Sequence, residues 1–234
     1  MHYLKQRRIQ IILGCFLASS LVLSAFPQVD ISISRLFFDG SFYLARQWWT
    51  TFMHESMGCF LGLALSSVVG LYAWNKLAKR SLCGVDGKKV VYLFLVLIVG
   101  AGLTVNVILK DNFGRARPRD IAEFGGSRQY TPPFVISAEC GTNCSFSSGE
   151  AAGGFFPLVL MMTLSRRRAL LAAAAGFGIL VSFCRIASGA HFFSDTVVSF
   201  FVMLTVADVL FFYLAISSTP ALATSERPAP PLPA

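Results

Sequence analysis

The sequence predicts an all-α protein, a bundle of six helices that cross a membrane. Of its 234 residues, 55% are hydrophobic and 14% are charged, and the mean hydropathy is +0.63. A soluble domain of this length would need more polar surface to cover its core. Several apolar runs are long enough to cross the hydrocarbon layer, which takes about 20 helical residues. We therefore expect one membrane domain over residues 1–216.

The predicted spans alternate with polar segments. The first apolar run follows a basic N-terminus; a cleaved signal peptide is an alternative, but an uncleaved span is favoured because further spans follow. Residues 30–55 mix aromatic and polar side chains, which indicates a segment at the membrane interface. Residues 217–234 are rich in Pro, Ala and Ser and predict a disordered cytoplasmic tail. The six predicted spans are residues 9–26, 58–74, 90–109, 151–164, 169–186 and 196–216.

The formal net charge of +8 fits membrane topology better than nucleic-acid binding. No basic run alternates with aromatics in the manner of a nucleic-acid surface, and no obligate protein partner is indicated. Six spans place both termini and the basic loops at 76–89 and 166–168 on one side, which the positive-inside rule makes cytoplasmic. The stretch 110–148 and the loop 188–191 then lie on the opposite side. Their basic residues break the rule and are candidates for function.

One such group is Arg185, His191 and Asp195. His191 and Asp195 are four residues apart and would share one face of a helix. The carboxylate could then accept a hydrogen bond from Nδ1–H, which leaves Nε2 free as a nucleophile or base. Taken alone, the pair is better explained as a satisfied interfacial histidine.

A second group contains Lys110 and Arg117, two turns apart if the segment is helical. Cations of this kind surround the oxygens of a transferred phosphoryl group. A basic loop at the lipid headgroups is the alternative, and it suits Arg115, Arg119 and Arg128.

A third group is the run from Ser147 to Glu150, just before the predicted fourth span. The backbone N–H groups at a helix N-terminus bind anions, and the Ser148 hydroxyl and Gly149 amide could contribute. A plain helix cap, with Ser148 followed by Glu150 in the first turn, is the simpler explanation.

Together the three groups resemble the type 2 phosphatidic acid phosphatase (PAP2) family, which also includes vanadium haloperoxidases. The matching elements are Lys110, six residues, Arg117-Pro118; then Ser148-Gly149; then Arg185, five residues, His191, three residues, Asp195. The resemblance implies the PAP2/haloperoxidase-like bundle and a metal-independent phosphatase without a cofactor. His191 would form a phosphohistidine and Asp195 would orient it. The implied phosphate ligands are Lys110, Arg117, Ser148, Gly149 and Arg185.

The sequence departs from the family pattern at Ser147, which replaces Pro, at Cys184, which replaces Ser, and at Glu150. Glu150 replaces a histidine that protonates the leaving oxygen. Glu150 could be that acid only if its pKa rose, so a substrate ligand or a helix-start carboxylate remain alternatives.

An acidic residue at position 150 also makes the chain similar to bacterial lipid A 4′-phosphatases, which act at the periplasmic face of the inner membrane. The loop residues that carry this similarity are Pro132-Pro133-Phe134-Val135-Ile136-Ser137 and Cys140…Asn143-Cys144-Ser145-Phe146. The expected substrate is thus a phosphorylated membrane lipid. Phosphatidylglycerophosphate, phosphatidic acid and undecaprenyl diphosphate are alternatives, as is a non-catalytic protein that binds anionic lipid.

The chain has six cysteines, too few for a disulfide scaffold in so large and apolar a protein. Cys140 and Cys144 share one polar loop and could form a local disulfide in an oxidising compartment. A metal site there is disfavoured, because no histidine or second cysteine pair joins them.

Overall fold

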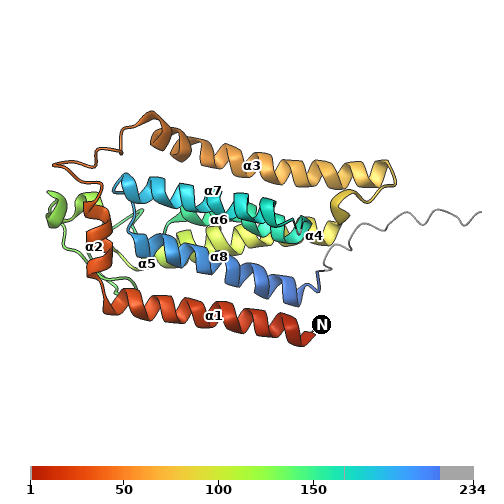
Figure 1. Ribbon diagram of the computed structural model, residues 1–234, viewed down its shortest axis with the longest axis horizontal. Coiled ribbons are helices and arrows are strands. Elements are labelled where there is room, and N and C mark those ends of the chain that lie inside the picture. Colours follow the sequence, from red (N-terminus) through yellow and green to blue (C-terminus); the bar gives the residue numbers. More distant parts are fainter. Residues whose placement is uncertain (1, 166, 217–234) are drawn as a thin grey trace, which may run out of the picture.

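The computed structural model describes residues 2–165 and 167–216, and all regular elements of this part are helices. The long helices lie side by side, and their connecting loops gather at the two ends of the bundle (Figure 1). The predicted tail at 217–234 lies outside the described residues. The main elements are α1 (His2–Ala25), α2 (Gln28–Arg35), α3 (Trp48–Leu77), α4 (Gly87–Leu95), η2 (Val96–Leu109), α5 (Lys110–Asn112), α6 (Gly149–Leu164), α7 (Arg168–Ala187) and α8 (Phe193–Tyr213).

Within the described ranges, five helices are long and apolar enough to cross a membrane. They are α1, α3, the continuous helix Gly87–Asn112, α7 and α8. The remaining apolar helix, α6, has 16 residues. The all-helical membrane fold predicted from the sequence is thus observed, whereas the length of α6 leaves five rather than six helices that qualify as spans.

The continuous helix Gly87–Asn112 carries a π-helical stretch, η2, between α4 and α5. The backbone N–H of Lys110 donates to the Val105 carbonyl, five residues back. π-Helical turns are uncommon and often lie near functional sites. Here the stretch ends at Leu109, directly before Lys110.

The predicted start of the second span was wrong. The sequence placed residues 30–55 at the interface and began the helix at about residue 58, but α3 begins at Trp48. The Thr50 hydroxyl donates to the carbonyls of Leu44 and Gln47, at 2.8 and 2.7 Å, and this stabilises the first turn. Polar residues in this turn hid the helix from a count of apolar residues. The extra turns place His54 on the helix.

Helix α6 lies at the centre of the bundle and packs against α3, α7, α8 and η2. Small residues on its first two turns allow close approach. A methyl group on Gly154 would lie 2.9 Å from the Val181 Cβ of α7, and one on Gly153 would lie 3.0 Å from Leu61 Cδ1 of α3. Because α6 is surrounded by other helices, its short apolar stretch is covered by protein.

A second, smaller core lies at the end of the bundle that carries residues 36–47, 113–148 and 188–192, here called the loop end. It contains Phe42, Phe124 and Phe192, whose neighbours Ala116 and Ile121 are also buried. Gly189 has a φ of +64°, and a methyl group there would lie 2.4 Å from the Phe42 ring. Only glycine meets both conditions without strain. This core therefore fixes the loop between α7 and α8.

Gly154→Ala should destabilise the protein, because the added methyl group overpacks the contact between α6 and α7. The expected loss is about 1–3 kcal/mol, measured as a lower Tm in detergent. Gly176→Ala is the matched control, because a methyl group on that glycine of α7 would meet no atom within 4 Å. Equal Tm values for the two variants would contradict this packing.

Candidate active site

A cavity of about 300 Å³ opens at the loop end of the bundle. Residues far apart in the chain line it, and five of the eight predicted site residues are among them. The lining residues are Ala45, Thr50, Thr51, His54, Lys110, Arg117, Arg119, Asn143, Glu150, Arg185, Ser188 and His191.

His191 lies in the loop between α7 and α8 and is 1% exposed. Its Nδ1 is 2.8 Å from the Ser145 carbonyl oxygen. A carbonyl only accepts, so Nδ1 carries the proton and Nε2 keeps its lone pair. Burial lowers the pKa of His191 to about 4, and the cations Arg117 and Arg185 act in the same direction, against the raising effect of Asp195. The imidazole is therefore neutral at neutral pH, as a nucleophile must be.

Asp195 supports His191 in a different way from the one predicted. The two residues do not share a helical face, because His191 precedes α8. His191 Nδ1 is 3.6 Å from Asp195 Oδ2, which is beyond hydrogen-bond distance. Asp195 instead accepts from the Ser145 hydroxyl at 2.5 Å and from the Phe192 N–H at 2.8 Å. It thus fixes the two segments that hold the imidazole.

Arg115 is buried in an ion-pair network, so its interpretation as a headgroup-facing residue was wrong. It is 1% exposed and lies 2.6 Å from Asp195 Oδ1 and 2.8 Å from Asp30 Oδ2. Its guanidinium also stacks on the Phe192 ring at 4.2 Å. Burial alone would lower the pKa of Arg115, but Asp195 and Asp30 outweigh it and raise the pKa. Arg115 therefore remains charged in the interior.

Lys110 and Arg117 both line the cavity, but not for the reason given by their spacing. The helix ends at Asn112, and Arg117 has extended backbone angles. The chain between them is a loop, so the fold brings them together rather than a shared helical face. Arg117 donates to the backbone carbonyl of Asn143 at 2.7 Å and to its side-chain oxygen at 2.9 Å. Burial and the neighbouring cations Arg119 and Arg185 lower the pKa of Arg117.

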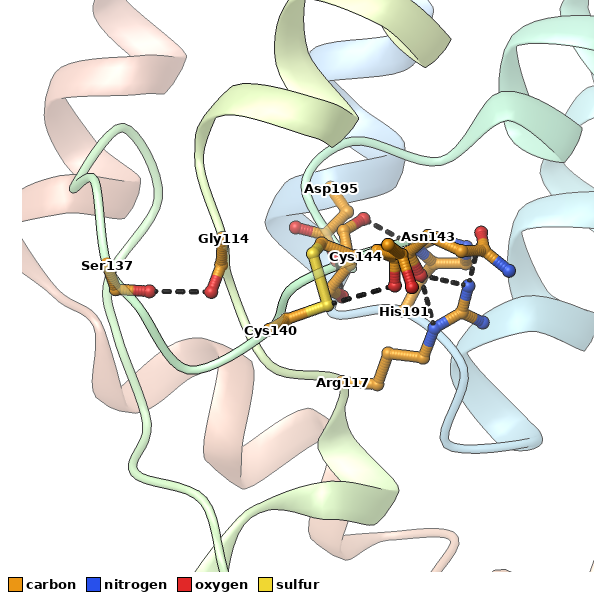
Figure 2. The surroundings of a disulfide bond; sticks show 10 residues. Gly114, Arg117, Ser137, Cys140, Asn143, Cys144, His191 and Asp195 are labelled. Atoms are coloured by element: carbon orange, nitrogen blue, oxygen red, sulfur yellow. Dashed lines mark hydrogen bonds and ion pairs between the residues drawn. A yellow bond between two sulfur atoms is a disulfide. The ribbon is translucent and has the colours of Figure 1, made fainter.

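The predicted local disulfide is formed between Cys140 and Cys144, with Cα atoms 5.6 Å apart. Figure 2 shows it beside Arg117, Asn143 and His191. Asn143 lies inside this small ring and has a φ of +51°. Ser145, which binds both His191 and Asp195, directly follows Cys144. The disulfide thus constrains the loop that orients both an arginine and the candidate nucleophile.

Ser148 and Gly149 are not on the cavity wall. Ser148 is fully buried and its hydroxyl accepts from the Ala151 N–H at 3.2 Å, which is the helix-cap arrangement. A methyl group on Gly149 would lie 2.4 Å from Asn106 Oδ1, so Gly149 permits close packing of α6 on η2. Their contact with phosphate stays a prediction.

Glu150 does face the cavity, where its carboxylate lies between two partners. Oε2 is 3.2 Å from Arg185 Nε, and Oε1 is 3.0 Å from His54 Nδ1. No motif in the sequence pointed to His54, which is 96 residues away from Glu150 in the chain. Asn143, Ser145 and Asp30 were also missed. Asn143 and Ser145 were part of the loop that carries the family similarity, and Asp30 was a charged residue close to an apolar span.

The site suits phosphoryl transfer: a neutral imidazole faces several cations at one end of a membrane bundle. Residues 89–217 match the protein family described as the PAP2 superfamily. A lipid A 4′-phosphatase of Francisella tularensis subsp. novicida is 34% identical over 203 residues, 81% of this chain and 89% of the relative. One of Rhizobium leguminosarum is 32% identical over 202 residues, 79% and 87% of the two chains.

Among solved structures, the transmembrane PAP2 type phosphatidylglycerolphosphate phosphatase of Bacillus subtilis has the same fold. Its TM-score is 0.59 at 19% identity, and the match covers 88% of this chain and 94% of that one. The chain therefore belongs to the PAP2 superfamily. The relatives and the fold support its assignment as a multi-pass membrane lipid phosphatase.

His191 should be a neutral imidazole with its proton on Nδ1 at a pH of about 5.5, where an ordinary histidine is mostly protonated. NMR of protein with isotope-labelled histidine measures this, and the chain has only three histidines to assign. His191→Asn identifies the signal by its loss. An imidazolium signal for His191 at that pH would contradict the buried, neutral state.

The double change Cys140→Ser and Cys144→Ser should lower kcat for phosphate release from a lipid. It should change Tm little, because so small a ring adds little stability. A displacement of His191 of about 1 Å can cost up to about 100-fold in rate. Phosphate release and thermal unfolding measure the two effects. The exposed free cysteines Cys15 and Cys59, changed together to Ser, are the control. Full activity without the disulfide would show that the loop does not need it.

Proposed function

We propose that this protein removes the 4′-phosphate of lipid A, with His191 as the nucleophile. The observation that carries the proposal is the His191 imidazole, whose Nδ1 is bound by the Ser145 carbonyl while the cavity around it is lined by four cationic side chains. The substrate is proposed from the relatives, which are named lipid A 4′-phosphatases and match most of this chain.

In the proposed reaction, Nε2 of His191 attacks phosphorus and forms a phosphohistidine, which water then hydrolyses. Lys110, Arg117 and Arg185 bind the phosphate oxygens and stabilise the charge of the transition state. Nδ1–H of His191 stays bound to the Ser145 carbonyl and stabilises the charge that develops on the ring. Asp195 holds Ser145 and the start of α8, so it positions the nucleophile indirectly.

We further propose that α6 is a sixth crossing and that the cavity faces the periplasm. Helix α6 would span about 24 Å at 1.5 Å per residue. This is short for a lipid-facing span, but α6 is enclosed by other helices. The basic loop at 76–89 and the N-terminus lie at the end opposite the cavity (Figure 1). Both termini would then be cytoplasmic by the positive-inside rule. A disulfide beside the cavity fits an oxidising periplasm.

Purified protein should release phosphate from lipid A in preference to phosphatidylglycerophosphate, phosphatidic acid and undecaprenyl diphosphate. Mass spectrometry of the lipid product locates the lost phosphate.

His191→Ala should reduce the rate to background. Arg117→Ala should lower kcat about 10²–10³-fold, because it removes charge from the transition state.

Arg128→Ala is the matched control for Arg117→Ala, because Arg128 is an exposed arginine of the same loop region that does not line the cavity. Its activity should equal that of the unchanged protein. Activity on glycerophospholipids alone would overturn the lipid A assignment, and full activity of His191→Ala would overturn the nucleophile.

A further inference from the structure

The cavity contains a second histidine that the sequence pattern did not predict. His54, on the early turns of α3, lines the same cavity as His191. Thr50 and Thr51, one turn earlier on the same face, line it too. Nδ1 of His54 is 3.0 Å from Glu150 Oε1, and its side chain is 57% exposed. His54 therefore lies at the open side of the cavity, whereas His191 lies at its buried side.

Cleavage of a phosphate ester requires a proton for the departing oxygen, and few groups in the cavity can supply one. Lys110, Arg117, Arg119 and Arg185 are cations that suit phosphate binding, and arginine does not give up its proton near neutral pH. His191 has its only proton bound to the Ser145 carbonyl.

Glu150 is also a poor source of that proton. Its two oxygens lie 3.2 Å from Arg185 Nε and 3.0 Å from His54 Nδ1, so both are already engaged by nitrogen atoms of the protein. An ionised carboxylate accepts hydrogen bonds and donates none. Histidine, by contrast, takes up and releases protons near neutral pH. His54, at the open side of the cavity and with Nδ1 held by Glu150, is the group positioned for the task.

We propose that His54 is the proton donor to the leaving oxygen and that Glu150 holds it in place, an inference that rests on the proposed phosphatase function. As Nε2 of His191 forms a bond to phosphorus, the bond from phosphorus to the lipid oxygen breaks. That oxygen takes the proton from Nε2 of the His54 imidazolium, while Nδ1–H stays on Glu150. The lipid leaves as an alcohol.

The second half of the reaction returns the proton. Neutral His54 accepts a proton from the water that attacks the phosphohistidine. The bond from phosphorus to His191 breaks, and its electron pair returns to Nε2. Phosphate leaves, and His54 is again an imidazolium. Glu150, in the position that the family pattern gives to a histidine, thus acts through a histidine supplied by another helix.

The dependence of rate on the leaving group tests this role. His54→Ala should lower kcat for the lipid substrate about 10²–10⁴-fold, the usual contribution of a general acid. The rate with para-nitrophenyl phosphate should fall far less, because its leaving oxygen needs no proton. Added imidazole should restore lipid hydrolysis by His54→Ala, since the exposed position leaves room for it. Glu55→Gln, an exposed neighbour on α3 outside the cavity, is the control.

The losses on the two substrates test whether His54 donates the proton. Unchanged lipid hydrolysis by His54→Ala, or equal losses on both substrates without imidazole rescue, would overturn the donor role and leave His54 as a residue that shapes the cavity. His54→Gln tests the same loss with a side chain of similar size, should the alanine variant fold poorly. A failure of the proposed function is separate: His191→Ala would then retain its activity on the lipid.

Discussion

The buried ion-pair network around Arg115 is the constraint on which the rest of the site depends. One guanidinium joins Asp30 of α2 to Asp195 of α8, and both carboxylates are buried. The backbone of Arg115 also binds Ser145, at 2.9 Å between the Ser145 N and the Arg115 carbonyl oxygen. Breaking such a pair leaves an unpaired buried charge, which costs about 3–5 kcal/mol. The network therefore fixes the segments that hold His191.

The site contains two groups of charged residues. One group holds neighbouring segments in position, and the other faces the cavity. Arg115 and its carboxylate partners are satisfied by one another and are closed to solvent. Arg117 and Arg185 are only partly used by protein partners and line the cavity. A preorganised cationic cavity acts strongly on a phosphate because few charges must rearrange during reaction. The disulfide and the second core at the loop end keep this arrangement rigid.

The helical membrane fold and five of the residues that line the cavity could be predicted from the sequence, because apolar run length and motif spacing are read directly along the chain. Explanations based on residue spacing along one helix were wrong where the folded chain brings distant segments together. Lys110 and Arg117 line one cavity although a loop separates them, and Asp195 holds the His191 segment through Ser145 and the Phe192 N–H. His54 could not be found, because its partner Glu150 is 96 residues away and its helix began in a segment too polar to identify.

The role of His191 as the nucleophile is tested by trapping the covalent intermediate. Protein mixed with lipid A carrying a radiolabelled 4′-phosphate is quenched rapidly under alkaline conditions, and the labelled peptide is identified by mass spectrometry. The expected result is phosphate bound to Nε2 of His191, formed and lost at rates consistent with turnover. Turnover without any labelled protein, or label on another residue, would contradict it.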